Sequence, residues 1–119
     1  MNLILLIGIG GAAGSIARFL LQRWLNDSFP IGTLTVNIAG CFIIGILWAI
    51  AIKNNWSTNY RLFLMTGFCG GFTTFSAFTL ESILLLQNSR YLFFIIYIFS
   101  SLVLGLLATF AGYKMMNNF

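Results

Sequence analysis

The centre of the third apolar segment decides how this sequence folds, and it reads TGFCGGFTTFSAFT over residues 66–79. Its glycines and its adjacent Thr73 and Thr74 are poor helix formers, although the surrounding segment is apolar enough to cross a membrane. We therefore expect the helix to break near Gly70–Thr74, giving two half-helices. Irregular backbone at membrane depth is tolerated only where protein buries it or where it lines a cavity. Its carbonyls could hold a cation, and its N–H groups and hydroxyls, including that of Ser76, could donate to an anion.

The composition of the whole chain indicates an integral membrane protein. Of its 119 residues, 60% are hydrophobic and only 7% are charged, whereas about a quarter of the residues of a soluble protein are charged. Four apolar segments, at residues 3–22, 31–52, 62–86 and 91–113, are each long enough to cross a hydrocarbon core of about 30 Å as a helix. We expect one all-α, four-helix transmembrane domain over residues 1–119, without a cleaved signal peptide and without a soluble domain before or after the helices.

The same composition argues against an enzyme and against a nucleic-acid partner. The chain has no histidine and only two acidic residues, so it offers no carboxylate pair, no nucleophile beside a base and no phosphate-binding loop followed by lysine. Its two cysteines, Cys41 and Cys69, fall inside expected spans, where small buried thiols are ordinary packing residues. The net charge of +4 comes from a few basic residues near the ends of the spans. It predicts neither nucleic-acid binding nor a transition-metal site.

The basic residues do not orient the chain in the bilayer. With four spans, one side of the membrane carries Lys53, Arg61 and Lys114. The other side carries Arg23 and Arg90, and also Arg18 if it is counted. Because the side with more Lys and Arg normally stays inside, a score of three against two or three leaves two interpretations. Either one residue decides, or copies insert both ways, and the second interpretation allows an antiparallel homodimer.

Small residues recur at helical spacing in the first and fourth spans. They are Gly10, Gly14 and Ala17 in the first span, and Ser101, Gly105, Thr109 and Gly112 in the fourth. Helices in membranes approach closely where side chains are small. We interpret the stripes as support for an oligomer, although packing within one chain would use them equally well.

Polar and aromatic residues inside the spans are the candidates for a functional site. The amide of Asn37 has two hydrogens that could face an anion. Arg18 could reach the membrane surface or place positive charge in a vestibule, and Glu81 could pair with a basic residue or face a water-filled mouth. Phe75 and Phe78 share one helix face, and the positive edges of their rings could line an anion path, or the rings could simply pack.

Three motifs, in chain order, resemble those of the Fluc/CrcB fluoride channels. They are GGAAGSIARF (residues 10–19), GTLTVNIAGCF (residues 32–42) and GFCGGFTTFSAF (residues 67–78). Together with the length and the four spans, the resemblance covers essentially the whole chain. It implies an antiparallel, dual-topology homodimer that crosses the bacterial cytoplasmic (inner) membrane several times. Such a channel passes fluoride passively through two pores along the dimer interface and so protects the cell.

The resemblance also implies roles for residues along the anion path. Phe75 and Phe78 would form an aromatic box beside the path, and Asn37 would donate a hydrogen bond to fluoride. Ser76 and Thr109 would belong to a polar track that faces the two phenylalanines.

Other implied roles concern the support of the path. Backbone carbonyls of Gly70 and Thr73 from both subunits would hold a structural sodium ion at the dimer centre. Arg18 would act through vestibule electrostatics or as support. We assign Glu81 to the same group of vestibule or supporting residues. One departure is Ala77, since many relatives have threonine there, and the expected polar track therefore loses one hydroxyl.

Two other functions fit the architecture less well. Small proton-coupled multidrug exporters also have four helices and dual topology, but they rely on a carboxylate in the first helix. This chain has none there, because Glu81 lies in the third span. A non-transporting assembly subunit would leave the irregular third span without a purpose.

Overall fold

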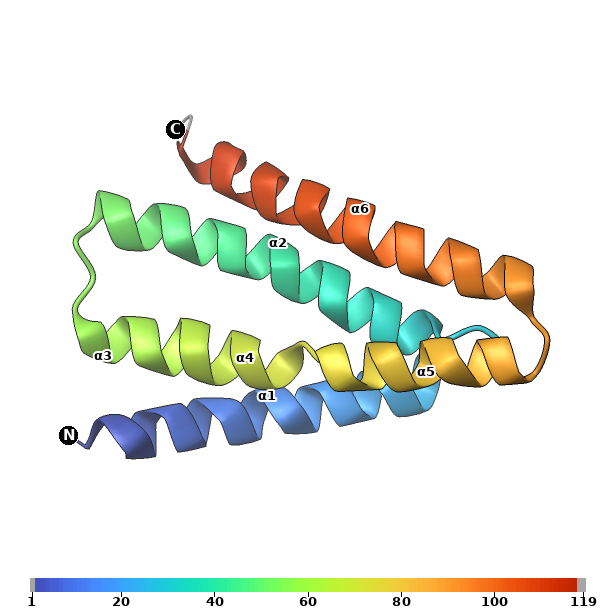
Figure 1. Ribbon diagram of the computed structural model, residues 1–119. Coiled ribbons are helices and arrows are strands. Elements are labelled where there is room, and N and C mark those ends of the chain that lie inside the picture. Colours follow the sequence, from blue (N-terminus) through green and yellow to red (C-terminus); the bar gives the residue numbers. More distant parts are fainter. Residues whose placement is uncertain (1, 118–119) are drawn as a thin grey trace.

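The computed structural model describes residues 2–117, and these residues form an all-helical molecule with four elements long and apolar enough to cross a membrane (Figure 1). The elements are α1 (Leu3–Leu25), α2 (Ile31–Lys53), a third span over Thr58–Gln87 and α6 (Tyr91–Asn117). Their lengths are 23, 23, 30 and 27 residues, against the roughly 20 that a bilayer requires. The expectation of an all-α protein with four membrane-length spans is therefore confirmed.

The helices extend beyond the apolar segments that predicted them. α1 continues to Leu25 rather than residue 22, and α6 continues to Asn117 rather than residue 113. The added turns are more polar, and α1, α2 and α6 each carry a basic residue in the last turn. A cation there is favoured by the helix dipole, so helix formation continues past the apolar boundary.

The third span is made of four consecutive segments. They are α3 (Thr58–Tyr60), η1 (Arg61–Cys69), α4 (Gly70–Phe72) and α5 (Phe75–Gln87). η1 is a π-helix, a form that is rare and frequently found near functional sites. Between α4 and α5, the backbone of Thr73 and Thr74 is extended, with φ and ψ of −90° and 157° at Thr73 and −148° and 117° at Thr74.

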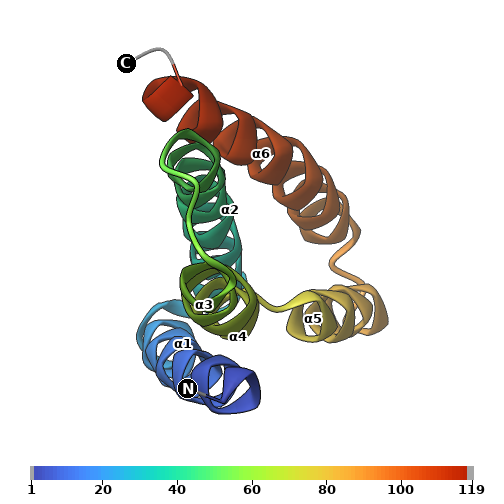
Figure 2. The ribbon, with the colours of Figure 1, turned by 90° about the vertical axis from the view of Figure 1, so that its left-hand side faces the viewer.

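The unwinding expected over Gly70–Thr74 is narrower in the structure. Gly70 and Gly71 are helical, and only Thr73 and Thr74 leave the helix. The segments on either side form one joined element that keeps its general direction (Figure 1), while α5 is displaced sideways from α4 (Figure 2). Glycine disfavours a helix by only about 1 kcal/mol, and Gly71 is needed for packing, because a Cβ there would meet the backbone of Gly11 at 2.5 Å.

Glycine allows the helices to pack as two close pairs, α1 with η1 and α4, and α2 with α6 (Figure 2). A Cβ on Gly14 would collide with the backbone oxygen of Phe68, and a Cβ on Gly112 would collide with that of Phe42. Much of both small-residue stripes is therefore used inside the chain. Gly8 differs, since a Cβ placed there would meet no described atom within 4 Å apart from its own turn of α1.

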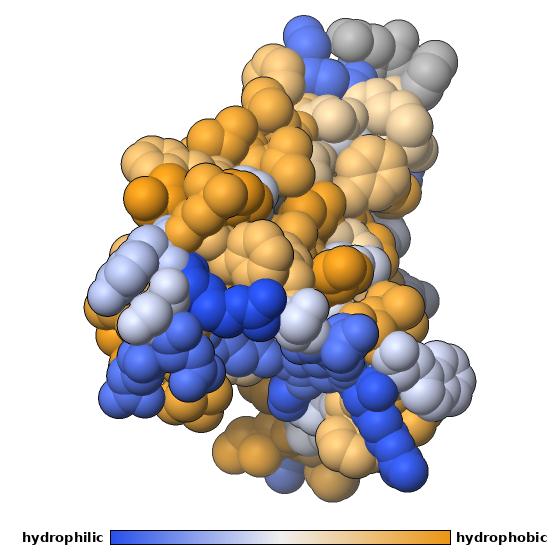
Figure 3. All heavy atoms as spheres, turned by 90° about the vertical axis from the view of Figure 1, so that its right-hand side faces the viewer, coloured by the Kyte–Doolittle hydropathy of each residue, from blue (hydrophilic) through white to orange (hydrophobic). Residues whose placement is uncertain are grey.

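The two ends of the helix bundle hold different parts of the chain. Both termini of the described chain and the turn between α2 and α3 lie at one end, as an even number of spans requires (Figure 1). The α1–α2 and α5–α6 loops lie at the other end, where Arg90 Nη1 donates to the backbone oxygen of Ser28 at 2.9 Å and joins the two loops. Figure 3 views this end and shows hydrophilic residues gathered over the loops, with hydrophobic residues around them.

Candidate functional site

Asn37 of α2 binds the backbone of Thr74 at the point where the third span leaves the helical conformation. Its Nδ2 donates to the oxygen of Thr74 at 3.0 Å, and its Oδ1 accepts from the N–H of Thr74 at 2.7 Å. Unsatisfied backbone groups are costly at membrane depth, so this amide stabilises the extended residues. Nδ2 has a second hydrogen, and its use by an anion stays a prediction.

The two threonines support the helices on either side of them. The hydroxyl of Thr74 accepts from the N–H of Ala77 at 3.1 Å and so caps the first turn of α5, which is a preferred use of threonine. It also lies 3.3 Å from the hydroxyl of Ser76. Thr73 donates to the oxygen of Cys69 from both its N–H, at 3.0 Å, and its hydroxyl, at 2.9 Å. The residues that interrupt the helix therefore also close its ends.

A cavity of about 390 Å³, here called the central cavity, lies beside this interruption. It is lined by Asn37, Gly40, Cys41, Ile44, Met65, Cys69, Gly70, Thr73, Thr74, Phe75, Phe78, Ser101 and Leu102. It thus brings together Asn37, Phe75, Phe78, Gly70 and Thr73, all of which the sequence placed in the site. The walls are largely apolar, which is typical of small-ligand sites with a few polar groups.

The two phenylalanines of the central cavity have different surroundings. Their ring centroids are 5.7 Å apart, but Phe75 is 73% exposed and Phe78 is 8% exposed. Phe78 packs on Tyr97 in an edge-on arrangement, with centroids 5.1 Å apart. Phe78 is therefore part of the core of this chain, whereas the ring of Phe75 is free for another partner.

Ser101 adds a polar group to the same cavity. Its hydroxyl oxygen is buried and has no hydrogen-bond partner among residues 2–117. A buried hydroxyl without a partner is costly, so this oxygen is suited to a ligand that enters the cavity. The sequence predicted Ser101 only as a small packing residue.

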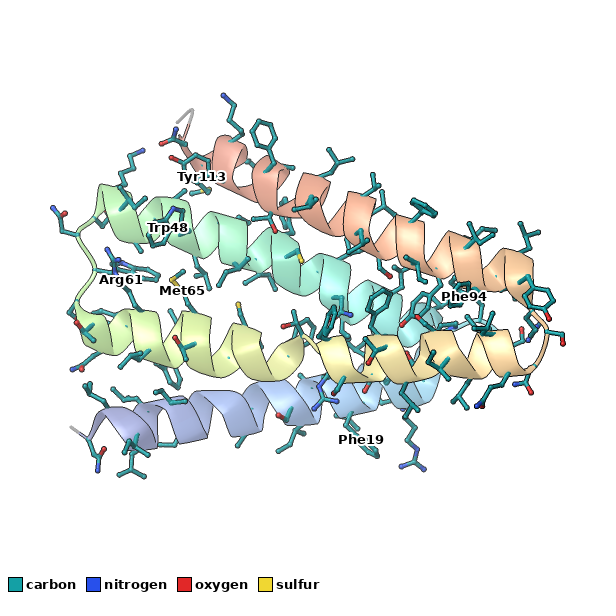
Figure 4. The ribbon with its side chains drawn as sticks, viewed as in Figure 1. Phe19, Trp48, Arg61, Met65, Phe94 and Tyr113 are labelled. Carbon is teal, nitrogen blue, oxygen red and sulfur yellow. The ribbon has the colours of Figure 1, made fainter. Side chains whose placement is uncertain are left out.

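Thr109 does not lie with the phenylalanines within one chain. It lines a second cavity of about 650 Å³, here called the terminal cavity, between α2, α6 and η1. Figure 4 shows Trp48, Met65 and Tyr113, which also line this cavity, near the end of the bundle that holds the termini. Met65 also lines the central cavity, so the two cavities adjoin. Ser76 is exposed.

Glu81 receives three hydrogen bonds from uncharged groups within the described chain. The hydroxyl of Tyr97 donates to Oε1 at 2.8 Å, and the hydroxyl of Thr33 and Nδ2 of Asn26 donate to Oε2 at 2.9 and 3.1 Å. Thr33 and Tyr97 have no exposed surface. This carboxylate cluster, formed by Glu81, Thr33, Asn26 and Tyr97, joins α5 to α2, α6 and the α1–α2 loop.

Water can approach the carboxylate cluster from the loop end of the bundle. Glu81 lines two open cavities there, of about 300 and 510 Å³. The smaller contains Asp27 and Arg90, and the larger contains Gln22 and Ala77. Ala77 is therefore placed beside Glu81 and away from the central cavity, so its effect on the expected polar track stays untested.

Arg18 turns inward rather than along the membrane surface. Its Nε donates to the backbone oxygen of Gly71 at 3.0 Å, and its Nη1 donates to Oε1 of Gln22 at 3.2 Å. Gly71 is the second residue of α4, close to the point where the helix ends. A cation near that end is favourable because the last carbonyls of a helix carry partial negative charge.

Sequence reasoning missed Thr33, Tyr97, Asn26 and Gln22. Thr33 had a usable signal, since it lies four residues before Asn37 and so shares a helix face with it. Tyr97 had none, because a tyrosine in an apolar span is ordinarily a packing or interfacial residue. These residues meet Glu81 only through the tertiary arrangement.

The sequence matches the family described as CrcB-like protein, Camphor Resistance (CrcB), over residues 5–113. The chain belongs to the CrcB family. Among its relatives, a protein of Gloeothece citriformis (strain PCC 7424) is 48% identical over 113 residues, covering 92% of each chain. One of Rhizobium meliloti (strain 1021) is 46% identical over 121 residues, covering 98% of this chain and 97% of the relative. One of Azobacteroides pseudotrichonymphae genomovar. CFP2 is 45% identical over 115 residues, covering 92% of each.

These three members of the CrcB family are each named fluoride-specific ion channel FluC. The family resemblance drawn from the three motifs is thereby confirmed. Family membership and the four membrane-length helices make the chain a multi-pass membrane protein. The relatives are ion channels and not enzymes, in agreement with the expectation from composition.

Proposed function

We propose that this protein is a fluoride-selective ion channel that releases fluoride passively and so protects the cell from its toxicity. The observation that carries the proposal is the membership of the CrcB family, with relatives named fluoride-specific ion channels at 45–48% identity over nearly the whole chain. The chemistry of the site supports it. Fluoride is small and strongly hydrated, so a narrow path must replace its water with hydrogen-bond donors that still let it leave.

Donors of this kind lie in and near the central cavity. The unpartnered hydroxyl of Ser101, the second amide hydrogen of Asn37 and the positive ring edges of Phe75 and Phe78 are weak donors in a largely apolar enclosure. None is a fixed positive charge, which would hold an anion too tightly for rapid passage. Toward the loop end, Glu81 lines two open cavities, and the hydroxyls of Thr33 and Tyr97 hold its carboxylate in place. The anion path would therefore run from the central cavity toward Glu81.

A second copy of the chain would complete the path. Phe75 is 73% exposed beside the central cavity, and the adjoining terminal cavity holds Thr109. An antiparallel partner would cover this side, bury Phe75 and bring the partner's phenylalanines near Thr109 and Ser76. The two-fold symmetry of such a homodimer would generate two equivalent pores. The even distribution of basic residues is compatible with insertion in both orientations.

The central sodium ion belongs to the same proposal. Sodium prefers oxygen ligands, and Gly70 and Thr73 line the central cavity. Thr73 has extended backbone, with ψ of 157°, so its carbonyl is released from the helical pattern. One chain supplies the carbonyls of Gly70 and Thr73, which are too few for an alkali ion, and a two-fold partner would bring the total to four oxygens. The residues present thus fit a structural sodium at a dimer centre.

The location follows from the proposed activity. Fluoride enters a cell from acidic surroundings as neutral HF and dissociates inside, so an exit channel is useful in the cytoplasmic (inner) membrane of a bacterium. The direct cellular test is growth of a bacterium that lacks its own fluoride exit route. Expression of this chain should restore growth in fluoride, and expression of Phe75→Ile at the same level should not. Equal growth with the variant would contradict the placement of the path at Phe75.

A further inference from the structure

A row of hydrogen bonds joins the third span to the carboxylate cluster through α1 and α2. Arg18 donates from Nη1 to Oε1 of Gln22 at 3.2 Å, and Gln22 donates from Nε2 to the hydroxyl of Thr33 at 2.9 Å. Thr33 in turn donates to Oε2 of Glu81 at 2.9 Å. At the other end, Nε of Arg18 is anchored on the backbone oxygen of Gly71 at 3.0 Å.

Arg18 sets the orientation of the Gln22 amide in this row. A guanidinium has donors only, so it must face the oxygen of the Gln22 amide and not its nitrogen. The nitrogen of Gln22 then faces Thr33, whose hydroxyl has to accept. The single hydrogen of the Thr33 hydroxyl is therefore left for Glu81. The orientation of the amide follows from the partners on its two sides.

The Thr33 hydroxyl is also held from a second side. Nδ2 of Asn26 lies 3.3 Å from the same oxygen, so both lone pairs of the hydroxyl are in use. Thr33 has no exposed surface, and water cannot readily replace a lost partner. Removing Gln22 would free one lone pair and remove one of the two donors that hold the hydroxyl oxygen in place, so the oxygen would be positioned less firmly against Glu81.

We propose that Gln22 is a positioning residue of the anion path, which fixes the Thr33 hydroxyl so that it donates to the Glu81 carboxylate. Gln22 acts through Thr33 and is not itself a ligand of the ion. The effect on transport rests on the proposed function, whereas the effect on the Glu81 carboxylate does not. The two parts can therefore be tested separately in the full-length protein.

Two substitutions at Gln22 separate its two hydrogen bonds. Gln22→Glu keeps an oxygen for Arg18 but removes the nitrogen that donates to Thr33. In Gln22→Met, the side chain keeps a similar length but loses both hydrogen bonds, the one from Arg18 and the one to Thr33. Gln87 provides matched controls, because it is the other glutamine of the chain and lies exposed at the end of α5. Gln87→Glu and Gln87→Met repeat the changes of charge and polarity away from the row.

Fluoride release from liposomes tests the effect on transport. We expect Gln22→Glu and Gln22→Met to lower the rate by similar factors of about ten, the factor that one hydrogen bond is worth. Both Gln87 variants should keep the wild-type rate. If Gln22→Glu kept the wild-type rate while Gln22→Met lost it, Gln22 would serve only to hold Arg18, and the proposal would be overturned.

Infrared spectroscopy tests the positioning without any transport. Glu81 is the single glutamate of the chain, so protein labelled with carbon-13 at the glutamate carboxyl reports on this group alone. Thr33→Val removes the hydroxyl that donates to Glu81. Its band therefore gives the shift expected when the Thr33–Glu81 hydrogen bond is lost completely. Gln22→Met should move the labelled band in the same direction, and Gln87→Met should leave it in place.

The infrared band and the rate of fluoride release together test two claims, the positioning role of Gln22 and its link to the anion path. An unchanged Glu81 band in folded Gln22→Met overturns the positioning role, whatever the transport rate. A shifted band together with slower fluoride release supports the whole proposal. A shifted band with normal release overturns the link to the path. A shifted band in Gln22→Met, combined with a wild-type protein that releases no fluoride, would keep the positioning role and reject the proposed function.

Discussion

The side-chain amide of Asn37 pairs with the backbone of Thr74 as one peptide group pairs with another. It accepts from the N–H at 2.7 Å and donates to the carbonyl at 3.0 Å. α2 therefore supplies the partners that the third span lacks where its backbone becomes extended. This pair fixes α5 relative to α4, and with it the position of Phe75 beside the central cavity.

Replacement of Asn37 by aspartate tests this pair. The carboxylate keeps an acceptor for the N–H of Thr74 but places a second oxygen against its carbonyl, so we expect the free energy of unfolding to fall by about 1–3 kcal/mol. Fluoride release should fall at least about tenfold, because the third span loses its support. Asn59→Asp, at an exposed position in α3, is the control and should behave as wild type. Normal release from Asn37→Asp would exclude the amide from the path.

Phe75→Ile separates a pore role from a packing role. Phe75 is 73% exposed within one chain, so its loss should change the stability of the isolated chain by less than about 0.5 kcal/mol. Fluoride release should nevertheless fall at least about tenfold, since the ring edge that faces the path is lost. Phe99→Ile is the control, because Phe99 is 63% exposed on α6 and should tolerate the change. A wild-type rate from Phe75→Ile, with dimers intact by cross-linking, would remove Phe75 from the path.

Gly14→Ala tests the close packing of α1 on the third span. The added methyl would overlap the backbone oxygen of Phe68, and backbone cannot move aside as a side chain can. We expect a loss of about 1–3 kcal/mol in unfolding free energy, measured by denaturant titration in detergent. Gly8→Ala, in the same helix and facing no described atom within 4 Å, should be neutral or slightly stabilising. Equal stability of the two variants would contradict the helix pairing.

The four spans follow from local sequence, which predicted a wider break than the Thr73–Thr74 interruption in the joined third span. The polar contacts of the site do not follow from local sequence. Hydropathy over some 20 residues predicts a membrane helix without reference to the other helices. The partners of Glu81 come from α2, α6 and a loop, at separations of up to 55 residues. Composition also gave no sign of the π-helix of η1, whose Gly67 packs against the backbone of α1.

Asn37 illustrates the same limit at a single residue. The sequence predicted a polar side chain that needs partners at membrane depth, and this was sufficient to select it. The sequence could not predict that the backbone of Thr74 would use both ends of the amide. The proposed contact with fluoride therefore depends on the one remaining hydrogen of Nδ2.

Tyr97→Phe removes one donor to Glu81 and leaves the ring in place. The edge-on contact with Phe78, at 5.1 Å between centroids, should remain. We expect the unfolding free energy to fall by about 1–3 kcal/mol, the value of a buried hydrogen bond to a charged group, together with a fall in fluoride release. Tyr60→Phe, at a 60% exposed position, is the control. A variant with both wild-type stability and wild-type release would show that the carboxylate cluster does not need Tyr97.

Selective passage of fluoride is measured by efflux from liposomes that contain the purified protein. A fluoride electrode records release after a potassium ionophore is added, and parallel liposomes loaded with chloride measure selectivity. We expect rapid fluoride release, no matching chloride release, and loss of the fluoride signal in Phe75→Ile. Absence of fluoride release from liposomes shown to contain folded dimer, or chloride release at the same rate, would contradict selective passage of fluoride.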